Sequence, residues 1–207
     1  MAFLNLKDSF DFLNKNNINT LAYTLISSKK DLKNFKEYPY VLKLSSSLLH
    51  KTEKKVVFVN LNNKKDLENS YDSLKKVIFN EKIKKYDILL QKQIPGIEII
   101  IGIKEDKQFG KVILFGFGGI FTEVFKDSSI KILPISKKDL NFLFSETKIG
   151  SILEKGFRNK KYPIKELKEM IYNISNLAIK YNIKELDINP LIINENGLYI
   201  VDSRILL

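Results

Sequence analysis

The sequence predicts an α+β protein with a largely antiparallel sheet. Short apolar runs typical of strands are mixed with amphipathic helical segments, without the strict alternation of strand and helix that accompanies a parallel sheet. Near the C-terminus, the turn-forming residues 194–197 include an Asn-Gly pair and separate two apolar runs, as in a β-hairpin. The chain has 207 residues, of which 44% are hydrophobic and 29% charged, so it can bury a full core.

The composition also excludes several classes of protein. There are no cysteines, so disulfides and thiolate metal sites are excluded. No apolar run reaches the roughly 18 residues of a membrane span, and the N-terminus lacks the pattern of a secretory signal. By elimination, we expect a cytoplasmic protein without a membrane partner. The net charge of +11 is compatible with a polyanionic partner such as nucleic acid, a nucleotide, CoA or an acidic subunit, but the lysines are spread along the whole chain.

In the first half of the chain, periodicity separates three helices from four strands. The segment 65–79 is the clearest helix, because apolar residues recur every three or four positions along one face. A polar loop at 50–55 interrupts two apolar strands. The expected helices are 6–16, a segment beginning at 31–35, and 65–79; the expected strands are 21–26, 40–44, 56–61 and 86–91.

In the second half, two strands lead into a glycine-rich stretch and helices follow. The expected strands are 97–103 and 112–115, and the run 120–125 continues beyond the glycines. A helix at 137–144 has Ser136 as its N-cap, and 164–181 is the longest helix. The basic stretch 150–161 is expected to be irregular. The last element is the hairpin, with strands 186–193 and 198–201.

Polar side chains lie at the open ends of the hairpin strands. Asp187 and Asn189 are on the first strand, and Asp202 follows the second. Hairpin pairing brings such ends within about 5 Å. Two carboxylates and an amide oxygen at that separation suit Mg²⁺. The alternative is that these are turn and cap residues of an ordinary hairpin.

Two basic side chains are further candidates. Lys43 interrupts an apolar strand, where a lysine either meets an anion or extends outward from an edge strand. His50 is the only histidine. Lys51 beside it disfavours the imidazolium form and favours the neutral, nucleophilic imidazole that could accept a phosphoryl group. The alternative is a plain surface histidine.

Two backbone segments could approach a ligand closely. Gly116, Gly118 and Gly119 offer backbone amides of the kind found in phosphate-binding loops, although a tight turn between strands explains them equally well. The stretch lacks the spacing of the dinucleotide-binding and Walker A motifs. The connector from Gln91 to Gly96 could read an adenine edge, and Glu98 after it could accept ribose hydroxyls.

Together, these segments resemble the ATP-grasp β subunit of ADP-forming acetate–CoA ligase, a relative of succinyl-CoA synthetase. The similarity spans residues 6–205, in the order and at the spacing of the family. The segments that carry it are YPYVLKLSSSLLHKTE, QKQIPGIEIIIGIKEDKQFG, VILFGFGGIFTEVFKD, ELDINPLI and VDSRI. The resemblance implies one ATP-grasp domain over 1–207, with a small lobe at about 20–90 and a large lobe formed by 91–207 plus the N-terminal helix.

The resemblance also implies roles for particular residues. By position, Lys43 would contact the phosphates of ATP or ADP, and Glu98 would hold the ribose. His50 matches a histidine that relays a phosphoryl group. The implied adenine contacts are Gln91 and the backbone near Lys92 and Ile94, and the implied Mg²⁺ ligands are Asp187, Asn189 and Asp202. Gly118 and Gly119 would belong to the phosphate loop. Glu123 and Arg158 fall on family motifs as further catalytic candidates.

Some positions depart from the family pattern. The loop after His50 lacks two glycines that the family has, and Lys54 and Lys55 stand near that point. No acyl or CoA site lies on the chain, which implies a separate CoA-binding α subunit and an α2β2 assembly.

The resemblance implies transfer of a phosphoryl group from phosphohistidine to ADP, within the reaction that converts acyl-CoA, ADP and phosphate to acid, ATP and CoA. Because the loop glycines are missing, an alternative is that the chain is a degenerate subunit that binds nucleotide, or only its partner subunit, and regulates that partner without catalysis. A basic nucleic-acid-binding protein is a third hypothesis, but no recognisable module supports it.

Overall fold

The structure, a computed structural model, describes residues 3–46, 56–119, 127–156 and 160–207. The chain divides into two compact units. The first, here called the small unit, comprises Asn5–Lys7 and Leu21–Ile94, and the second, the large unit, comprises Met1–Leu4, Asp8–Thr20 and Pro95–Leu207. Each unit contains an antiparallel sheet with helices, so the predicted α+β class is confirmed. In the described part of the chain, no helix is both long and apolar enough to cross a membrane.

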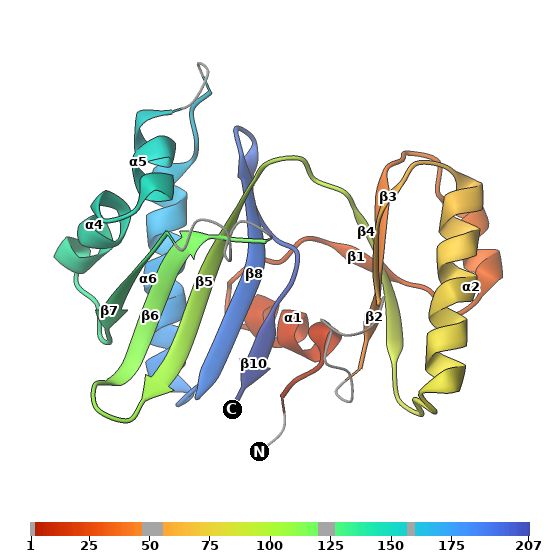
Figure 1. Ribbon diagram of the computed structural model, residues 1–207, viewed down its shortest axis with the longest axis horizontal. Coiled ribbons are helices and arrows are strands. Elements are labelled where there is room, and N and C mark those ends of the chain that lie inside the picture. Colours follow the sequence, from red (N-terminus) through yellow and green to blue (C-terminus); the bar gives the residue numbers. More distant parts are fainter. Residues whose placement is uncertain (1–2, 47–55, 120–126, 157–159) are drawn as a thin grey trace. The chain divides into compact units, whose positions relative to one another are not determined.

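The small unit is a four-stranded antiparallel sheet covered by helices. Its elements are β1 (Tyr23–Leu25), the 3₁₀ helix η1 (Lys29–Asn34), β2 (Tyr40–Ser45), β3 (Val57–Leu61), α2 (Lys64–Asn80) and β4 (Asp87–Lys92). The strand order is β1-β4-β2-β3. Helix α2 packs along one face (Figure 1), where its apolar stripe, including Leu67 and Leu74, meets Leu42 and Leu44 in one core cluster. The predicted helix at 65–79 is therefore confirmed.

Strand β3 contains a bulge close to its end. Tyr40 pairs with Leu61 and Leu42 pairs with Phe58, so two residues of β3 lie opposite one residue of β2. Asn60 is one of the two, and its φ of +56° places it in the left-handed region. Asparagine tolerates this conformation better than most residues other than glycine.

The large unit is built on a six-stranded antiparallel sheet. Its elements are α1 (Leu6–Lys15, from Asp8 on), β5 (Ile97–Asp106), β6 (Gly110–Phe117), β7 (Ser128–Ile132), α4 (Lys137–Ser145), α5 (Lys148–Lys155), α6 (Ile164–Lys180), β8 (Glu185–Asn194), β9 (Gly197–Ile200) and β10 (Arg204–Leu206). The strand order is β10-β8-β5-β6-β7, and β9 also pairs with β8. Helices α4, α5 and α6 cover one face (Figure 1), and alternate residues of β5, Ile99, Ile101 and Ile103, are buried.

The predicted C-terminal hairpin is confirmed and is longer than expected. Strand β9 pairs with β8 through the turn, with Leu191 opposite Ile200. Strand β10 continues in the same register, with Asp187 opposite Arg204. The pairing is interrupted between them, where β8 bulges against β5: Ile99 pairs with Leu191, but Ile101 pairs with Ile188.

Two other elements differ from the sequence expectation. Helix α5 occupies much of the stretch expected to be irregular, because its N-terminus is capped both by the residue directly before it and by a distant carboxylate. The Thr147 side chain accepts from the amide of Gly150, and the Asp127 carboxylate accepts from the amides of Lys148 and Ile149, both at 2.9 Å. Strand β7 was not expected at all, and it forms by pairing with β6 along one edge of the sheet.

Candidate functional site

Three of the predicted site residues meet at one place in the large unit. Gly118 and Gly119 follow β6 and lie against β5, where the amide of Gly118 donates to the Glu98 carbonyl oxygen over 2.9 Å. The amide of Gly119 donates to Oδ1 of Asn189, on β8, over 2.8 Å. A β-carbon on Gly119 would overlap the Glu98 carboxylate, so that side chain lies directly beside the glycine. The structure therefore groups Glu98, Gly119 and Asn189.

The two glycines do not present their amides as expected for a phosphate loop. Both N–H groups already have acceptors within the chain. Glycine is needed here because the backbone of this stretch packs closely against the backbone of β5. A β-carbon on Gly118 would lie 2.5–2.9 Å from backbone atoms of Ile99, and Gly119 has a φ of +58°. In this structure, the glycine stretch positions the side chains of Glu98 and Asn189.

The predicted magnesium ligands lie on the β8 bulge, near it on the same strand, and opposite it in register. Asn189 and Pro190 together lie opposite the single residue Ile100 of β5, and their peptide bond is cis. Strands β9 and β10 pair with β8 in one continuous register, which sets Asn189 opposite Asp202. Asp187 lies two positions before Asn189 on β8. All three side chains are partly exposed.

These donors fit a hard divalent cation. They provide two carboxylates and one amide oxygen, the oxygen types that Mg²⁺ binds together with water and phosphate. The Asn189 oxygen has a second lone pair beside the one used by Gly119. No group of three or more His, Cys, Asp or Glu suited to a metal occurs among the described residues. Such a site would therefore rely on Asn189 and on ligands from outside the chain.

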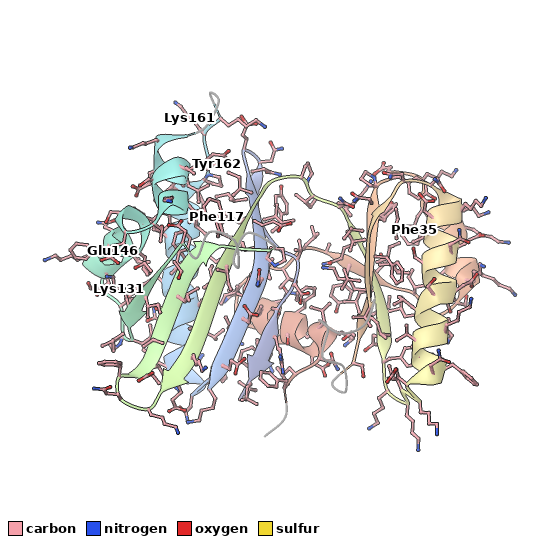
Figure 2. The ribbon with its side chains drawn as sticks, viewed as in Figure 1. Phe35, Phe117, Lys131, Glu146, Lys161 and Tyr162 are labelled. Atoms are coloured by element: carbon pink, nitrogen blue, oxygen red, sulfur yellow. The ribbon has the colours of Figure 1, made fainter. Side chains whose placement is uncertain are left out.

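A cavity of about 780 Å³ opens beside this group in the large unit. Its walls are mainly apolar, with Phe117 from the end of β6 and Ile149 and Ile152 from α5. Figure 2 shows Phe117 and Tyr162, which both line it. Glu98 is the only predicted site residue among the described lining residues, and Lys160 and Glu195 form an ion pair of 3.5 Å there. The predicted metal ligands do not line this cavity.

Two other predicted residues are buried in the small unit. Lys43 is only 4% exposed, between the core residues Leu42 and Leu44 on β2. It is therefore not the outward-facing lysine that was the alternative. Gln91, on the neighbouring strand β4, is 2% exposed. Its Nε2 donates to the Leu21 carbonyl oxygen over 3.1 Å, whereas its Oε1 is buried without a hydrogen-bond partner among the described residues.

The connector after β4 is held by residues that sequence reasoning missed. The ammonium of Lys92 lies 4.8 Å from the centre of the Tyr40 ring and 3.5 Å from the Glu37 carboxylate. Burial raises the pKa of the Tyr40 hydroxyl, which keeps that ring neutral beneath the cation. The next residue, Gln93, makes two side-chain hydrogen bonds with Asn60. The only local signal was the asparagine-rich run at 60–63, which is typical of turns and positive φ.

The remaining predicted residues lie outside the described part of the chain. These are His50, Glu123 and Arg158. Of the other ten, the structure places Lys43, Gln91, Lys92 and Ile94 in the small unit, and Glu98, Gly118, Gly119, Asp187, Asn189 and Asp202 in the large unit.

Comparisons with known proteins identify relatives over nearly the whole chain. Residues 2–207 match the family described as the ATP-grasp domain. The chain is 35% identical over 183 residues to the β subunit of ADP-forming acetate–CoA ligase II of Pyrococcus furiosus, covering 82% of this chain and 75% of that protein.

Solved structures show the same fold. The dinucleotide-forming acetyl-coenzyme A synthetase 1 of Korarchaeum cryptofilum, in complex with coenzyme A and Ca-AMPCP, matches with a TM-score of 0.84 and 30% identity, over 100% of this chain and 93% of that one. A second structure of the same protein, with coenzyme A and Mg-AMPPCP, matches with a TM-score of 0.80 and 28% identity over the same shares. The chain has the ATP-grasp fold and belongs to the ATP-grasp family, among the relatives of ADP-forming acetate–CoA ligase β subunits.

Proposed function

We propose that this chain is the nucleotide-binding β subunit of an ADP-forming acyl-CoA synthetase, working with a separate CoA-binding α subunit in an α2β2 assembly. The overall reaction converts acyl-CoA, ADP and phosphate to a carboxylic acid, ATP and CoA. In the step assigned to this chain, the P–N bond of phosphohistidine breaks, and a P–O bond forms to the terminal phosphate oxygen of ADP. The two compact units are taken as the two lobes of one ATP-grasp domain.

The observation that carries this proposal is the grouping of Glu98, Gly119 and Asn189. It brings a carboxylate that could hold ribose hydroxyls next to an amide oxygen that could ligate a metal, in a chain of the ATP-grasp family. The buried Oε1 of Gln91 gives independent support, because an unsatisfied buried acceptor costs about 1–3 kcal/mol. A donor from a bound adenine would satisfy it.

The residues divide the work of phosphoryl transfer. Magnesium, when bound, would neutralise developing charge on the phosphate oxygens, and Asp187, Asn189 and Asp202 would hold it. The ammonium of Lys43 would stabilise the phosphates of the nucleotide, since a buried lysine is strongly stabilised by an anion. Glu98 would orient the ribose. Catalysis then consists mainly of positioning and electrostatic stabilisation.

The first test is binding by the isolated chain. We expect MgADP to bind and to raise the thermal stability, with no acyl-CoA synthetase activity from the chain alone. Calorimetric titration with and without Mg²⁺ measures the binding, and a coupled assay for ATP formation measures turnover. Absence of any nucleotide binding, or robust turnover by this chain alone, would contradict the proposal.

The second test addresses His50 in the reconstituted complex with an α subunit. We expect His50→Ala to abolish ATP formation and to leave nucleotide affinity within a few-fold, because the histidine would carry the phosphoryl group rather than bind the nucleotide. Acid-labile label from labelled phosphate should appear on the wild-type chain and be absent from the variant. Persistent label or undiminished turnover in the variant would end the assignment of His50.

A regulatory subunit that binds nucleotide without catalysis is the second candidate. It is favoured by Lys54 and Lys55, which stand near the point where the family has loop glycines. The same reconstituted complex separates the two candidates. A complex that binds MgADP tightly but forms no ATP, and whose α subunit changes its own activity when the chain is present, would favour regulation.

A further inference from the structure

The side chain of Gln93, directly after β4, is clamped by Asn60 of β3, which lies on the far side of β2 in the same sheet. Its Oε1 accepts from the backbone amide of Asn60 over 2.6 Å, and its Nε2 donates to Oδ1 of Asn60 over 2.6 Å. A third hydrogen bond, of 3.1 Å, runs from the backbone amide of Gln93 to the Pro39 carbonyl oxygen. All three bonds lie within the small unit. Gln93 therefore has its backbone amide and both polar side-chain atoms engaged in hydrogen bonds.

The bulge in β3 makes this clamp available. The extra residue at the bulge withdraws the amide of Asn60 from regular pairing with β2, and a φ of +56° turns the residue toward Gln93. The amide needs an acceptor because backbone donors are rarely left unsatisfied. Oε1 of Gln93 supplies that acceptor, and the Asn60 side chain closes the second bond.

The clamp lies at the end of the small unit, just before the chain enters the large unit at Pro95. Lys92 precedes Gln93, and Ile94 follows it as the last residue of the small unit. These flanking residues are the ones whose backbone would face adenine under the proposed function. The side chain of Lys92 makes a cation–π contact with Tyr40 and an ion pair with Glu37. Neighbouring peptide groups in a short connector move together, so fixing Gln93 restricts both of them.

We propose that the Asn60–Gln93 clamp is a positioning pair that holds the connector backbone in the conformation that reads the purine base. This inference rests on the proposed function, because it assigns the pair to the nucleotide site of that function. It concerns the base alone and predicts no effect on the phosphates. The clamp should therefore affect the affinity for nucleotides, and the choice between adenine and guanine, without affecting a ligand that lacks a base.

The experiment measures dissociation constants of the full chain for MgADP, MgGDP and magnesium pyrophosphate, with thermal unfolding as a check on folding. Gln93→Met keeps the length of the side chain and removes both bonds. We expect MgADP to bind about five- to tenfold more weakly, as expected for losing about one net hydrogen bond's contribution. The ratio of the ADP and GDP dissociation constants should move toward one, and pyrophosphate affinity should stay unchanged.

Three variants grade the effect. Asn60→Asp keeps an acceptor for Nε2 and should bind MgADP within about twofold of wild type. Asn60→Gly keeps the backbone conformation and the first bond, so it should be intermediate. The double variant Gln93→Met with Asn60→Gly should be no weaker than Gln93→Met alone, because a pair that acts as one unit is not additive.

Gln108→Met, at an exposed glutamine in the β5–β6 turn of the large unit, is the matched control and should behave as wild type. Wild-type affinity and base preference in Gln93→Met would overturn the clamp while leaving the proposed function intact. Equal losses for MgADP and pyrophosphate would also overturn it, since a general structural defect would then explain the result. Failure of the wild-type chain to bind either nucleotide would instead overturn the proposed function, and the clamp's role with it.

Discussion

The two β-bulges found among the described strands have the same local form and different consequences. In the small unit, Asn60 is one of two β3 residues opposite a single residue of β2. In the large unit, Asn189 is one of two β8 residues set against β5. Both bulges redirect an asparagine out of a regular ladder. Asn60 uses its backbone amide and its side-chain oxygen to bind one side chain, that of Gln93. The Asn189 oxygen accepts from Gly119 instead, and Asn189 has Asp202 opposite it and Asp187 two positions before it.

The two bulges therefore have different roles. A bulge whose polar groups are satisfied by a single nearby side chain can only fix that segment of chain. A bulge that sets an amide oxygen near two carboxylates can also bind a ligand. The comparison predicts that substitutions at the β8 bulge should impair metal-dependent binding, whereas those at the β3 bulge should change base reading and local stability.

The largest effect is expected at the packing contact that supports the β8 bulge. Gly118→Ala would place a β-carbon 2.5 Å from the backbone carbon of Ile99, and neither that strand nor the glycine stretch can move freely. We expect the free energy of unfolding to fall by about 3 kcal/mol, within the range for overpacked sites. Urea unfolding followed by circular dichroism measures it. A variant as stable as wild type would show that the backbone around Ile99 can move to accommodate the extra β-carbon.

The next effect concerns the proposed metal ligands. Asn189→Ala and Asp202→Asn should each weaken MgADP binding by about 1–3 kcal/mol, the range for losing a charge-assisted contact. Binding of ADP without Mg²⁺ should change much less. Titration calorimetry in the presence of Mg²⁺ and of a chelator separates the two. Wild-type MgADP affinity in both variants would show that the β8 bulge does not hold the metal.

The β3 bulge provides a smaller effect on stability. Asn60→Val puts a β-branched residue at a φ of +56°, which should cost about 1–3 kcal/mol of unfolding free energy. Asn60→Gly accepts that conformation and should lose less. Comparing the two by thermal unfolding isolates the backbone strain from the lost hydrogen bond, and equal stabilities would mean that the positive φ is not required.

The smallest effect is expected at an ion pair remote from both bulges. Figure 2 shows Lys131 on β7 beside Glu146, which also accepts from the Ser129 hydroxyl. The Lys131 ammonium, followed by the Ser129 hydroxyl, lowers the pKa of the Glu146 carboxyl below its usual 4.5. A lowered folded-state pKa gives stability that is present above 4.5 and lost as pH falls through the folded value.

Glu146→Gln should therefore flatten the fall in stability on the acid side of pH 4.5, and it should leave the dependence near neutrality unchanged. Thermal unfolding midpoints measured from pH 7 to pH 3 test this. The wild-type acid slope in the variant would show that another carboxylate causes it.

The sequence by itself determined the elements whose signals are local. The amphipathic pattern of 65–79 produced helix α2, because burying one apolar face against a sheet needs that spacing. Ser136 begins α4 through its own capping box, and the Asn-Gly turn set the register of β8 and β9. The motifs also indicated the family, because they carry a specific order of residues.

Only the tertiary structure decided what depends on distant partners. Helix α5 has the local cap Thr147, and Asp127, 21 residues before Lys148, supplies a second cap from a distant part of the chain. The two glycine amides that the sequence offered to phosphate are taken by the Glu98 carbonyl and the Asn189 side chain. The Asn60–Gln93 clamp joins residues 33 positions apart across a bulge. Each of these depends on which strands become neighbours, and hydrogen-bond acceptors that arrive from another part of the chain leave no local pattern in the sequence.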